Sequence, residues 1–488
     1  MSVRAPADAR AASARPWAVL AVVLLGTALG AFNNSVASVL LPGVLESFPG
    51  TSVGAGGLLL TAYIFPTAVM VPLAGRLQDR LGVRPLYVGG LLACAGASLL
   101  CALAPSYPWL VAGRVLQGLA LAAVLPSVFA AAAMFPADRR GRALGVWAAV
   151  NGGSLTAGPL LGGLLVTALG WRGVFAFDVA LAVAAFAAAQ RLVPDVGRRD
   201  SGPIDYGGAA LLVGALVALL TTLSAAAASG AASVAALAGA LVTVVTGTAW
   251  FATALRRPDP FLDPRLFRRG TFGVLNAIVG LQMLFLFGIF FAVPLLLVVL
   301  HGVSNARAGV AVALTPLVAT VLAPFAGRVA DRVGTRLPLA AGATLLGAAG
   351  AGLAAAVDGG GAAVVAALVV AGIGISLIQS PVAAEVTRVV EGERAGLAVG
   401  IFNATRLVSG ALGTALFTLV FQLAGSIAPG AGLEAVAHDS LAAGFRAVFA
   451  AMAVAGAAAL AAALAWGPRF WRPSKAPADT RERHSGGR

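Results

Sequence analysis

A few polar and charged side chains interrupt the long apolar runs of this sequence, and they are the residues that could do chemistry. Asp178 has a carboxyl group, which can bind and release a proton. Arg114 and Arg406 can each pair with an anion. Asn33 and Asn34 are adjacent amides, which donate and accept hydrogen bonds but cannot exchange a proton near neutral pH. In a stretch that crosses a bilayer each of these side chains is costly, so each is a candidate for function.

The composition indicates which elements hold these residues. Hydrophobic residues make up 59% of the 488 positions and charged residues 11%, whereas a soluble domain has about 25% charged residues. One crossing of the hydrocarbon needs roughly 20 apolar residues. Fourteen runs satisfy that length, near residues 17–41, 53–75, 85–104, 108–134, 143–169, 172–193, 206–226, 231–254, 272–300, 306–327, 337–356, 362–387, 396–424 and 442–466. The sequence therefore predicts an all-α polytopic membrane protein.

The basic residues predict the orientation of these spans. The formal net charge is +14, and all but five of the 33 Lys and Arg residues fall in alternate loops and in the two tails. Such one-sided placement follows the positive-inside rule and puts those loops in the cytoplasm. We therefore expect a multi-pass protein of the cell membrane with both termini cytoplasmic. The basicity is explained by topology and does not indicate a nucleic-acid partner.

An internal repeat divides the chain. The segment GRLQDRLGVR at 75–84 returns as GRVADRVGTR at 327–336. Each copy follows the opening of a six-span unit by a similar distance, so the repeat predicts two parallel bundles with a substrate site between them. We expect the divisions to be a bundle at 1–200, two inserted spans within 201–270, a bundle at 271–470 and a disordered tail at 471–488.

The repeated segment predicts a gate at the cytoplasmic face. Its glycines permit a tight turn, and Asp79, near the start of the third span, is favoured by a helix N-terminus and can pair with nearby arginines. Such a charged cluster can close the inner face in one state and break in the other, and its second copy argues against an ordinary basic loop. The gate candidates are Gly75, Asp79, Arg80, Gly82, Arg84, Gly327, Asp331 and Arg332.

Two further segments lie inside spans. In the fourth span, Arg114 lies one turn from Gln117 on the same face, and Gly118 lets a neighbouring helix approach. A clamp between helices is the alternative role for this arginine. In the fifth span a proline bends the helix, and the glycines around it expose backbone for close packing. The residues of this run are Gly158, Pro159, Gly162 and Gly163.

Taken together, these segments resemble the three signature motifs of the major facilitator superfamily, and the run from Gly158 to Gly163 is similar to a motif of its exporters. Fourteen spans resemble its drug:proton antiporter branch, which has two extra central helices. WRGVF at 171–175 and the residues at 393–406 also resemble elements of that branch. The resemblance implies the major facilitator fold, with two six-helix bundles plus two inserted helices, and a function in multidrug efflux.

Two positions depart from that branch. It usually has Asp-x-Thr ahead of the Leu-Pro that ends the first span, where this chain has Asn33 and Ser35. It usually has Asn at the position of Asp178 in the sixth span. A carboxyl group is therefore present on a different helix, and we expect it to have taken over the protonation cycle. The proton-coupling candidates are Asp178, Arg114, Glu385 and Arg406.

The amides are candidates for the substrate cavity. If Pro42 closes the first span, Asn33 lies in its outer half, and Asn34 is turned about 100° from it around the helix. Asn33 either faces the cavity and contacts substrate or makes a hydrogen bond between helices. The cavity candidates are Asn33, Asn34, Gln117, Gln282 and Asn403.

These features favour a secondary active exporter of amphipathic small molecules that works by alternating access with proton coupling. An exporter dedicated to one endogenous metabolite or lipid, with the same fold, is the alternative. The three His residues lie outside the spans and no acids are paired within them, which argues against an enzyme. We expect a monomer without cofactor or metal. Its expected partners are the bilayer, protons and a small molecule. Because Arg114 and Arg406 lie deep in the spans, we expect this molecule to be neutral, zwitterionic or anionic.

Overall fold

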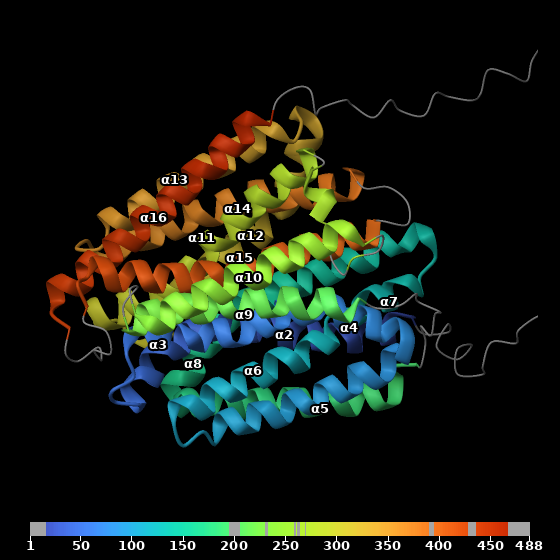
Figure 1. Ribbon diagram of the computed structural model, residues 1–488, viewed down its shortest axis with the longest axis horizontal. Coiled ribbons are helices and arrows are strands. Elements are labelled where there is room, and N and C mark those ends of the chain that lie inside the picture. Colours follow the sequence, from blue (N-terminus) through green and yellow to red (C-terminus); the bar gives the residue numbers. More distant parts are fainter. Residues whose placement is uncertain are drawn as a thin grey trace, which may run out of the picture.

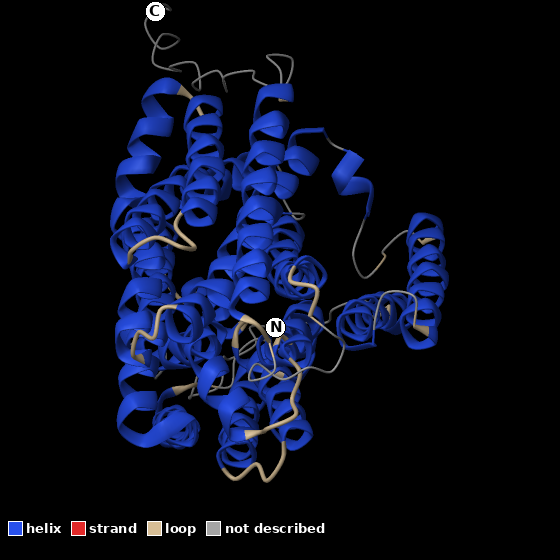
Figure 2. Cartoon of the chain, turned by 90° about the vertical axis from the view of Figure 1, so that its left-hand side faces the viewer, coloured by secondary structure: helices blue, strands red, loops and turns tan. Residues whose placement is uncertain are grey.

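The computed structural model describes residues 16–194, 205–229, 233–257, 260, 264–268, 270–389, 395–427 and 436–466. These residues form helices joined by short connections, with no strand among them (Figure 1, Figure 2). The helices of the N-terminal half are α2 (Pro16–Ser47), α3 (Val53–Gly56), α4 (Leu58–Leu81), α5 (Val83–Ala102), α6 (Tyr107–Val124), α7 (Ser127–Ala133) and α8 (Ala137–Leu192). The inserted helices are α9 (Tyr206–Ser229) and α10 (Val234–Arg256). The C-terminal half follows as the 3₁₀ turn η1 (Pro264–Arg268), α11 (Gly270–Leu295), the π turn η2 (Leu296–Leu300), α12 (Asn305–Val333), α13 (Arg336–Ala355), α14 (Gly361–Val389), α15 (Ala395–Ala424) and α16 (His438–Ala465).

Thirteen of the described helical stretches are long and apolar enough to cross a membrane, and the longest of them supplies two passes. This stretch, α8, contains the non-helical residue Gly170, where φ is 70° and favours glycine. Before that residue α8 packs on α2, with Gly158 against Ser35. After Gly170 the second part of α8 runs back along α2, where Asp178 accepts a hydrogen bond from Asn33. The fourteen expected spans are therefore confirmed.

The inserted pair lies at the seam between the two halves. In Figure 1 the N-terminal half, in blue to teal, lies beside the C-terminal half, in yellow to red, and α9 and α10, in green, lie in front of the line where the halves meet. α9 contacts α15 on one side and α3 and α4 on the other, while α10 packs mainly on α9. Val234, Leu237 and Leu241 of α10 are exposed, which suits a helix surrounded by lipid tails. The pair thus covers the contact between α4 and α15.

The halves approach closely at the end opposite the repeated basic segments. A Cβ atom added to Gly163 of α8 would lie 2.6 Å from the main-chain oxygen of Asn305, and one added to Gly309 of α12 would lie 2.2 Å from that of Pro159. Only glycine permits this approach, because real Cβ atoms do not come that near to backbone. We call this contact between α8 and α12 the glycine seam.

The other face of the same glycine run packs inside the N-terminal half. A Cβ atom at Gly158 would meet Ser35 Oγ at 1.9 Å, and one at Gly162 would meet Val36 Cγ2 at 2.5 Å, both on α2. The run that the sequence predicts for close packing therefore serves two contacts, one within its own half and one across the seam.

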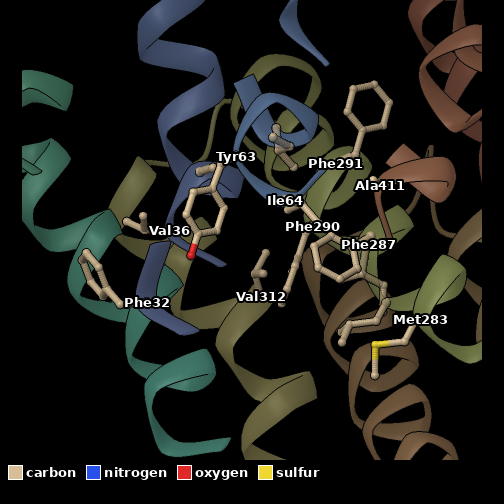
Figure 3. Packing of buried hydrophobic residues seen from close by; sticks show 14 of the residues in the cluster. Phe32, Val36, Tyr63, Ile64, Met283, Phe287, Phe290, Phe291, Val312 and Ala411 are labelled. Atoms are coloured by element: carbon tan, nitrogen blue, oxygen red, sulfur yellow. The ribbon is translucent and has the colours of Figure 1, made fainter. Parts of the chain in front are cut away.

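Apolar side chains fill the middle of the molecule between the halves. Figure 3 shows side chains of α2 and α4 opposite those of α11, α12 and α15. Aromatic rings dominate on α11, where Phe287, Phe290 and Phe291 are buried. On the other elements the buried neighbours include Ile64 and Val312.

The first span is longer than expected. The sequence predicts an end at Pro42, but α2 continues through this residue to Ser47. A proline removes one main-chain hydrogen bond from a helix, and neighbouring helices make this loss tolerable in a membrane. Pro42 and Val44 are both buried by such neighbours. The expected end is wrong by a few residues, and Asn33 lies just past the middle of α2, in the half that follows it along the chain.

The two repeated segments form the same turn. Gly82, between α4 and α5, has φ 95°, and Gly334, between α12 and α13, has φ 83°, a region that favours glycine. Each of these N–H groups donates to a carbonyl at 2.9 Å, that of Gln78 and that of Ala330 respectively. Asp79 lies in the last turn of α4, which corrects the expectation that it stands at the start of the next helix.

Candidate functional site

A buried carboxylate lies at the centre of a polar network in the N-terminal half. Asp178, on the returning part of α8, is 1% exposed. Its Oδ1 accepts a hydrogen bond from Asn33 Nδ2 at 2.7 Å. Its Oδ2 accepts one from Ser98 Oγ at 2.5 Å and one from Gln117 Nε2 at 3.1 Å. Four elements, α2, α5, α6 and α8, therefore meet at this side chain.

Arg114 of α6 is the cation of the same network and is fully buried. Its Nη1 donates to Asn33 Oδ1 and to Gln117 Oε1, both at 3.0 Å. Its Nη2 donates to the main-chain oxygen of Asn33 at 3.1 Å, and its Nε donates to that of Leu59 on α4 at 3.2 Å. Its Cζ lies 4.5 Å from the ring centroid of Tyr63, a cation–π distance.

Glycines let the helices come close enough for these bonds. A Cβ atom at Gly118 of α6 would lie 2.4 Å from the main-chain oxygen of Tyr63, and one at Gly113 would lie 2.5 Å from Cys101 Sγ on α5. The first approach brings Arg114 to α4, and the second brings α5 to α6. Gln117 Nε2 then donates to Ser98 Oγ at 2.8 Å.

Two amides separate the cation from the anion. Arg114 and Asp178 form no ion pair within the described helices, because Asn33 and Gln117 stand between them. Each amide turns its oxygen to the guanidinium and its nitrogen to the carboxylate, so both amide dipoles run from the cation to the anion. Buried charges need partners of this kind, and in this network each charge is met by several hydrogen bonds.

Four residues predicted from the sequence thus come together in this network, namely Asn33, Arg114, Gln117 and Asp178. The interpretation that Asn33 faces the cavity needs correction, because its amide is 1% exposed and both of its polar atoms bond inside the N-terminal half. Ser98 was missed. The signal that could have found it is the face of α5 on which Cys94, Ser98 and Cys101 succeed one another at helical spacing.

The remaining cavity and coupling candidates lie outside the network. Gln282 is fully buried on α11, and neither of its amide atoms has a hydrogen-bond partner among the described residues. Asn34 is half-buried, and its Oδ1 also has no hydrogen-bond partner among the described residues. Asn403 of α15 and Glu385 of α14 are half-buried.

Arg406 of α15 differs from Arg114 in its surroundings. Its Cζ lies 5.9 Å from the ring centroid of Phe402. Its Nε is buried and has no hydrogen-bond partner in the described part of the chain.

The gate candidates lie around the two repeated turns. Asp79, Arg84, Asp331 and Arg332 are exposed there, and Arg80 is half-buried. Gly75 of α4 lies near Pro126, and Gly327 of α12 lies near Ser380.

The gate candidate Arg84 forms a hydrogen bond within the N-terminal half and not with the C-terminal half. Arg84 Nη2 donates at 2.8 Å to the main-chain oxygen of Gln190, near the end of α8. Arg336, at the equivalent position of the second copy, donates in the same way to Leu464 near the end of α16, at 2.7 Å. Both bonds satisfy carbonyls that a helix C-terminus leaves open.

The chemistry available to the network is the uptake or release of one proton. Asp178 supplies the carboxyl group of the network, and the side chains packed around it keep bulk water away from it in this structure. The described residues contain no cluster of three or more His, Cys, Asp or Glu side chains that could hold a metal ion.

Two known proteins are similar to this chain in sequence. The multidrug resistance protein Stp of Mycobacterium tuberculosis is 29% identical over 404 residues, which cover 81% of this chain and 74% of that protein. The tetracenomycin C resistance and export protein of Streptomyces glaucescens is 28% identical over 428 residues, covering 86% and 79%.

Solved structures share the fold. A bacterial homologue of the human lysosomal transporter Spinster, in an inward-facing and unoccupied conformation, superposes with a TM-score of 0.67 over 96% of this chain and 100% of that one, at 17% identity. The Major Facilitator Superfamily itself matches residues 23–414. With a match over most of its length and the bundle arrangement described above, this chain belongs to the Major Facilitator Superfamily.

Proposed function

We propose that the protein is a proton-coupled secondary exporter of amphipathic small molecules that works by alternating access. Its relatives are drug-resistance transporters, one of which is named for export. The observation that carries the proposal is the closed network around Asp178 and Arg114, because it is a protonatable group buried in a membrane helix and linked to a cation. Ionisable residues at such places mark ion and substrate pathways.

The glycine seam supports the alternating-access part of the proposal. Gly163 and Gly309 hold α8 of one half against α12 of the other at one end of the molecule, and Gly57 lies against Thr418 of α15 at the same end. Contacts of this kind are the ones that rocking of one bundle against the other would break. We take this end to be the outer one, with both termini and the repeated basic segments in the cytoplasm.

The substrate class follows from charge and from aromatic surface. The rings of Phe287 and Phe290 are buried on α11, which faces α2 and α4 in Figure 3, and the ring of Phe402 lies beside Arg406 on α15. Arg406 adds a cation that forms no ion pair within the described residues, and a cation buried in a membrane favours an anionic partner. We therefore propose amphipathic substrates, neutral or anionic, with Arg406 as the residue that pairs with the anion.

The test uses purified protein in liposomes with an imposed pH gradient. The fluorescent compounds are 1-anilinonaphthalene-8-sulfonate as an anion, Nile red as a neutral compound and ethidium as a cation. The proposal predicts uphill movement that collapses with a protonophore, and loss of that movement in Asp178→Asn. Uphill movement that persists in Asp178→Asn would contradict coupling at this residue. Movement restricted to one endogenous lipid or metabolite would instead favour the dedicated exporter.

A further inference from the structure

We infer that Asn33 and Gln117 form a two-amide bridge that transmits the charge state of Asp178 to Arg114, so that both amides are positioning residues of the coupling step. This inference rests on the proposed function. It concerns residues that cannot themselves take up a proton near neutral pH, and it assigns them a defined task in the cycle.

The bridge is visible in the direction of its hydrogen bonds. Asn33 joins Arg114 to Asp178 through bonds of 3.0 and 2.7 Å, and Gln117 joins the same two residues through bonds of 3.0 and 3.1 Å. Arg114 thereby fixes which end of each amide faces the carboxylate. Ser98 adds a third donor to the same carboxylate at 2.5 Å. The two amides therefore present only donors to an ionised Asp178, whereas the Ser98 hydroxyl can donate either to Asp178 or to the main-chain oxygen of Cys94 at 2.8 Å.

Protonation changes this arrangement. When a proton binds to a carboxylate oxygen of Asp178, an O–H bond forms and the negative charge is lost. The new hydroxyl must find an acceptor, which is either Ser98 Oγ, if its own hydroxyl turns to the main-chain oxygen of Cys94, or the oxygen of one of the two amides. If either amide turns to offer its oxygen, Arg114 loses one of its two side-chain acceptors. Leu59 on α4 and the main chain of Asn33 on α2 also bond Arg114, so the change reaches two helices that contact α15 and α11 of the other half.

The groups around the carboxylate are few. α6 contributes Arg114, α5 contributes Cys94 and Cys101, and α4 contributes Tyr63. Thiols and phenols are ordinarily neutral near pH 7, so Arg114 is the group whose charge answers that of Asp178. Within the described helices no second carboxyl group shares the site.

The short Asn33–Asp178 contact makes a reciprocal exchange possible. Nδ2 of one side chain and Oδ1 of the other are 2.7 Å apart. In the variant Asn33→Asp/Asp178→Asn the same two atoms would trade places. The new carboxylate would accept directly from Arg114, and the amide at position 178 would still accept from Ser98 and Gln117. A functional exchange would show that the carboxyl group can act from either position, and the losses in Asn33→Leu and Gln117→Leu are what distinguish a bridge from packing.

The experiment compares five variants with the wild type: Asn33→Leu, Gln117→Leu, Asp178→Asn, the reciprocal exchange, and Gln422→Leu as control. Gln422 is a buried amide of α15, and its side-chain atoms have no hydrogen-bond partner among the described residues. Each protein is reconstituted, and export of 1-anilinonaphthalene-8-sulfonate and Nile red is measured uphill on a pH gradient and downhill without one. The melting temperature is recorded in parallel.

We expect Asn33→Leu, Gln117→Leu and Asp178→Asn to lose at least tenfold in uphill export relative to downhill export. Gln422→Leu should keep the wild-type ratio. The exchange should recover the ratio to within about threefold of the wild type and should regain most of the melting temperature lost in Asp178→Asn. Wild-type ratios in Asn33→Leu and Gln117→Leu, or an exchange variant that is stable but as uncoupled as Asp178→Asn, would overturn the bridge.

Failure of the proposed function gives a different result. If the wild type moves neither compound uphill, the proposed export is refuted, and the melting temperatures decide the bridge alone. Recovery of stability in the exchange variant would then support it, and stability no better than that of Asp178→Asn would reject it.

Discussion

Replacing Gly163 by alanine tests whether the glycine seam holds this conformation. The added Cβ atom would lie 2.6 Å from the main-chain oxygen of Asn305 and 3.2 Å from Cα of Gly309. Both neighbours are backbone atoms, so the helices themselves must move apart. Overpacking of this kind costs about 1–3 kcal/mol. The cost falls only on the state in which the seam is closed, so the open state should gain roughly 5- to 150-fold in population.

The population of the open state can be measured by the rate at which an introduced cysteine is labelled. Thr418 is 2% exposed and lies against Gly57 at the same end of the molecule. In a background with both native cysteines replaced by alanine, Thr418→Cys should react with a membrane-impermeant maleimide only when the halves separate there. Adding Gly163→Ala should raise the labelling rate by the factor given above.

Two glycines of the same helix provide matched controls. A Cβ atom at Gly153 would meet nothing within 4 Å, so Gly153→Ala should leave the labelling rate unchanged. A Cβ atom at Gly162 would press on Val36 of its own half, so Gly162→Ala should lower stability without opening the seam. If folded Gly163→Ala protein labels no faster than Gly153→Ala, the seam does not hold this state and the reasoning fails.

Other predictions concern individual side chains. Asp178→Asn should remove the dependence of export velocity on pH, measured in liposomes at fixed substrate; a preserved profile would place coupling elsewhere. Arg406→Gln should reduce export of 1-anilinonaphthalene-8-sulfonate at least tenfold and spare the neutral compound Nile red, and equal losses would argue against anion pairing. Arg84→Ala should destabilise by about 0.5–1 kcal/mol through the lost bond to Gln190, visible as a lower melting temperature. Asp79→Asn should slow turnover more than it weakens binding, and the reverse would contradict a gate role.

The lengths of the apolar runs were sufficient to predict the fold, because a membrane leaves few alternatives to a spanning helix. Backbone polar groups must be paired within each span, so a run of apolar residues implies a helix and its length implies a crossing. The reversal at Gly170 and the matching turns at Gly82 and Gly334 agree with this reasoning, since each needs a residue that tolerates positive φ. The end of α2 was misjudged because a proline was read as a stop, whereas packing carries the helix on to Ser47.

The site was predictable only in part, because the sequence reveals which residues are costly but not which way they face. Arg114 and Asp178 stood out by their cost, and their helices do meet. Asn33 and Asn34 are neighbours in the chain, and one of them had to face the inside of its own bundle. Nothing in the local sequence determines which, since that depends on the rotation of α2 against α6 and α8. Gly158 and Gly162 of α8 constrain that rotation by their close contacts with Ser35 and Val36 of α2, which a single sequence does not reveal.

The same geometry explains how a carboxyl group can stand on either of two helices. Asn33 Nδ2 and Asp178 Oδ1 come from α2 and α8 and lie 2.7 Å apart, so the two positions present their polar atoms to nearly the same point. Arg114 reaches that point through an amide now and would reach it directly if the carboxyl group were on α2. What the site requires is one carboxyl group, one amide and one guanidinium in contact. The helix that supplies the carboxyl group is then a secondary matter, and a motif that reads one helix at a time cannot detect it.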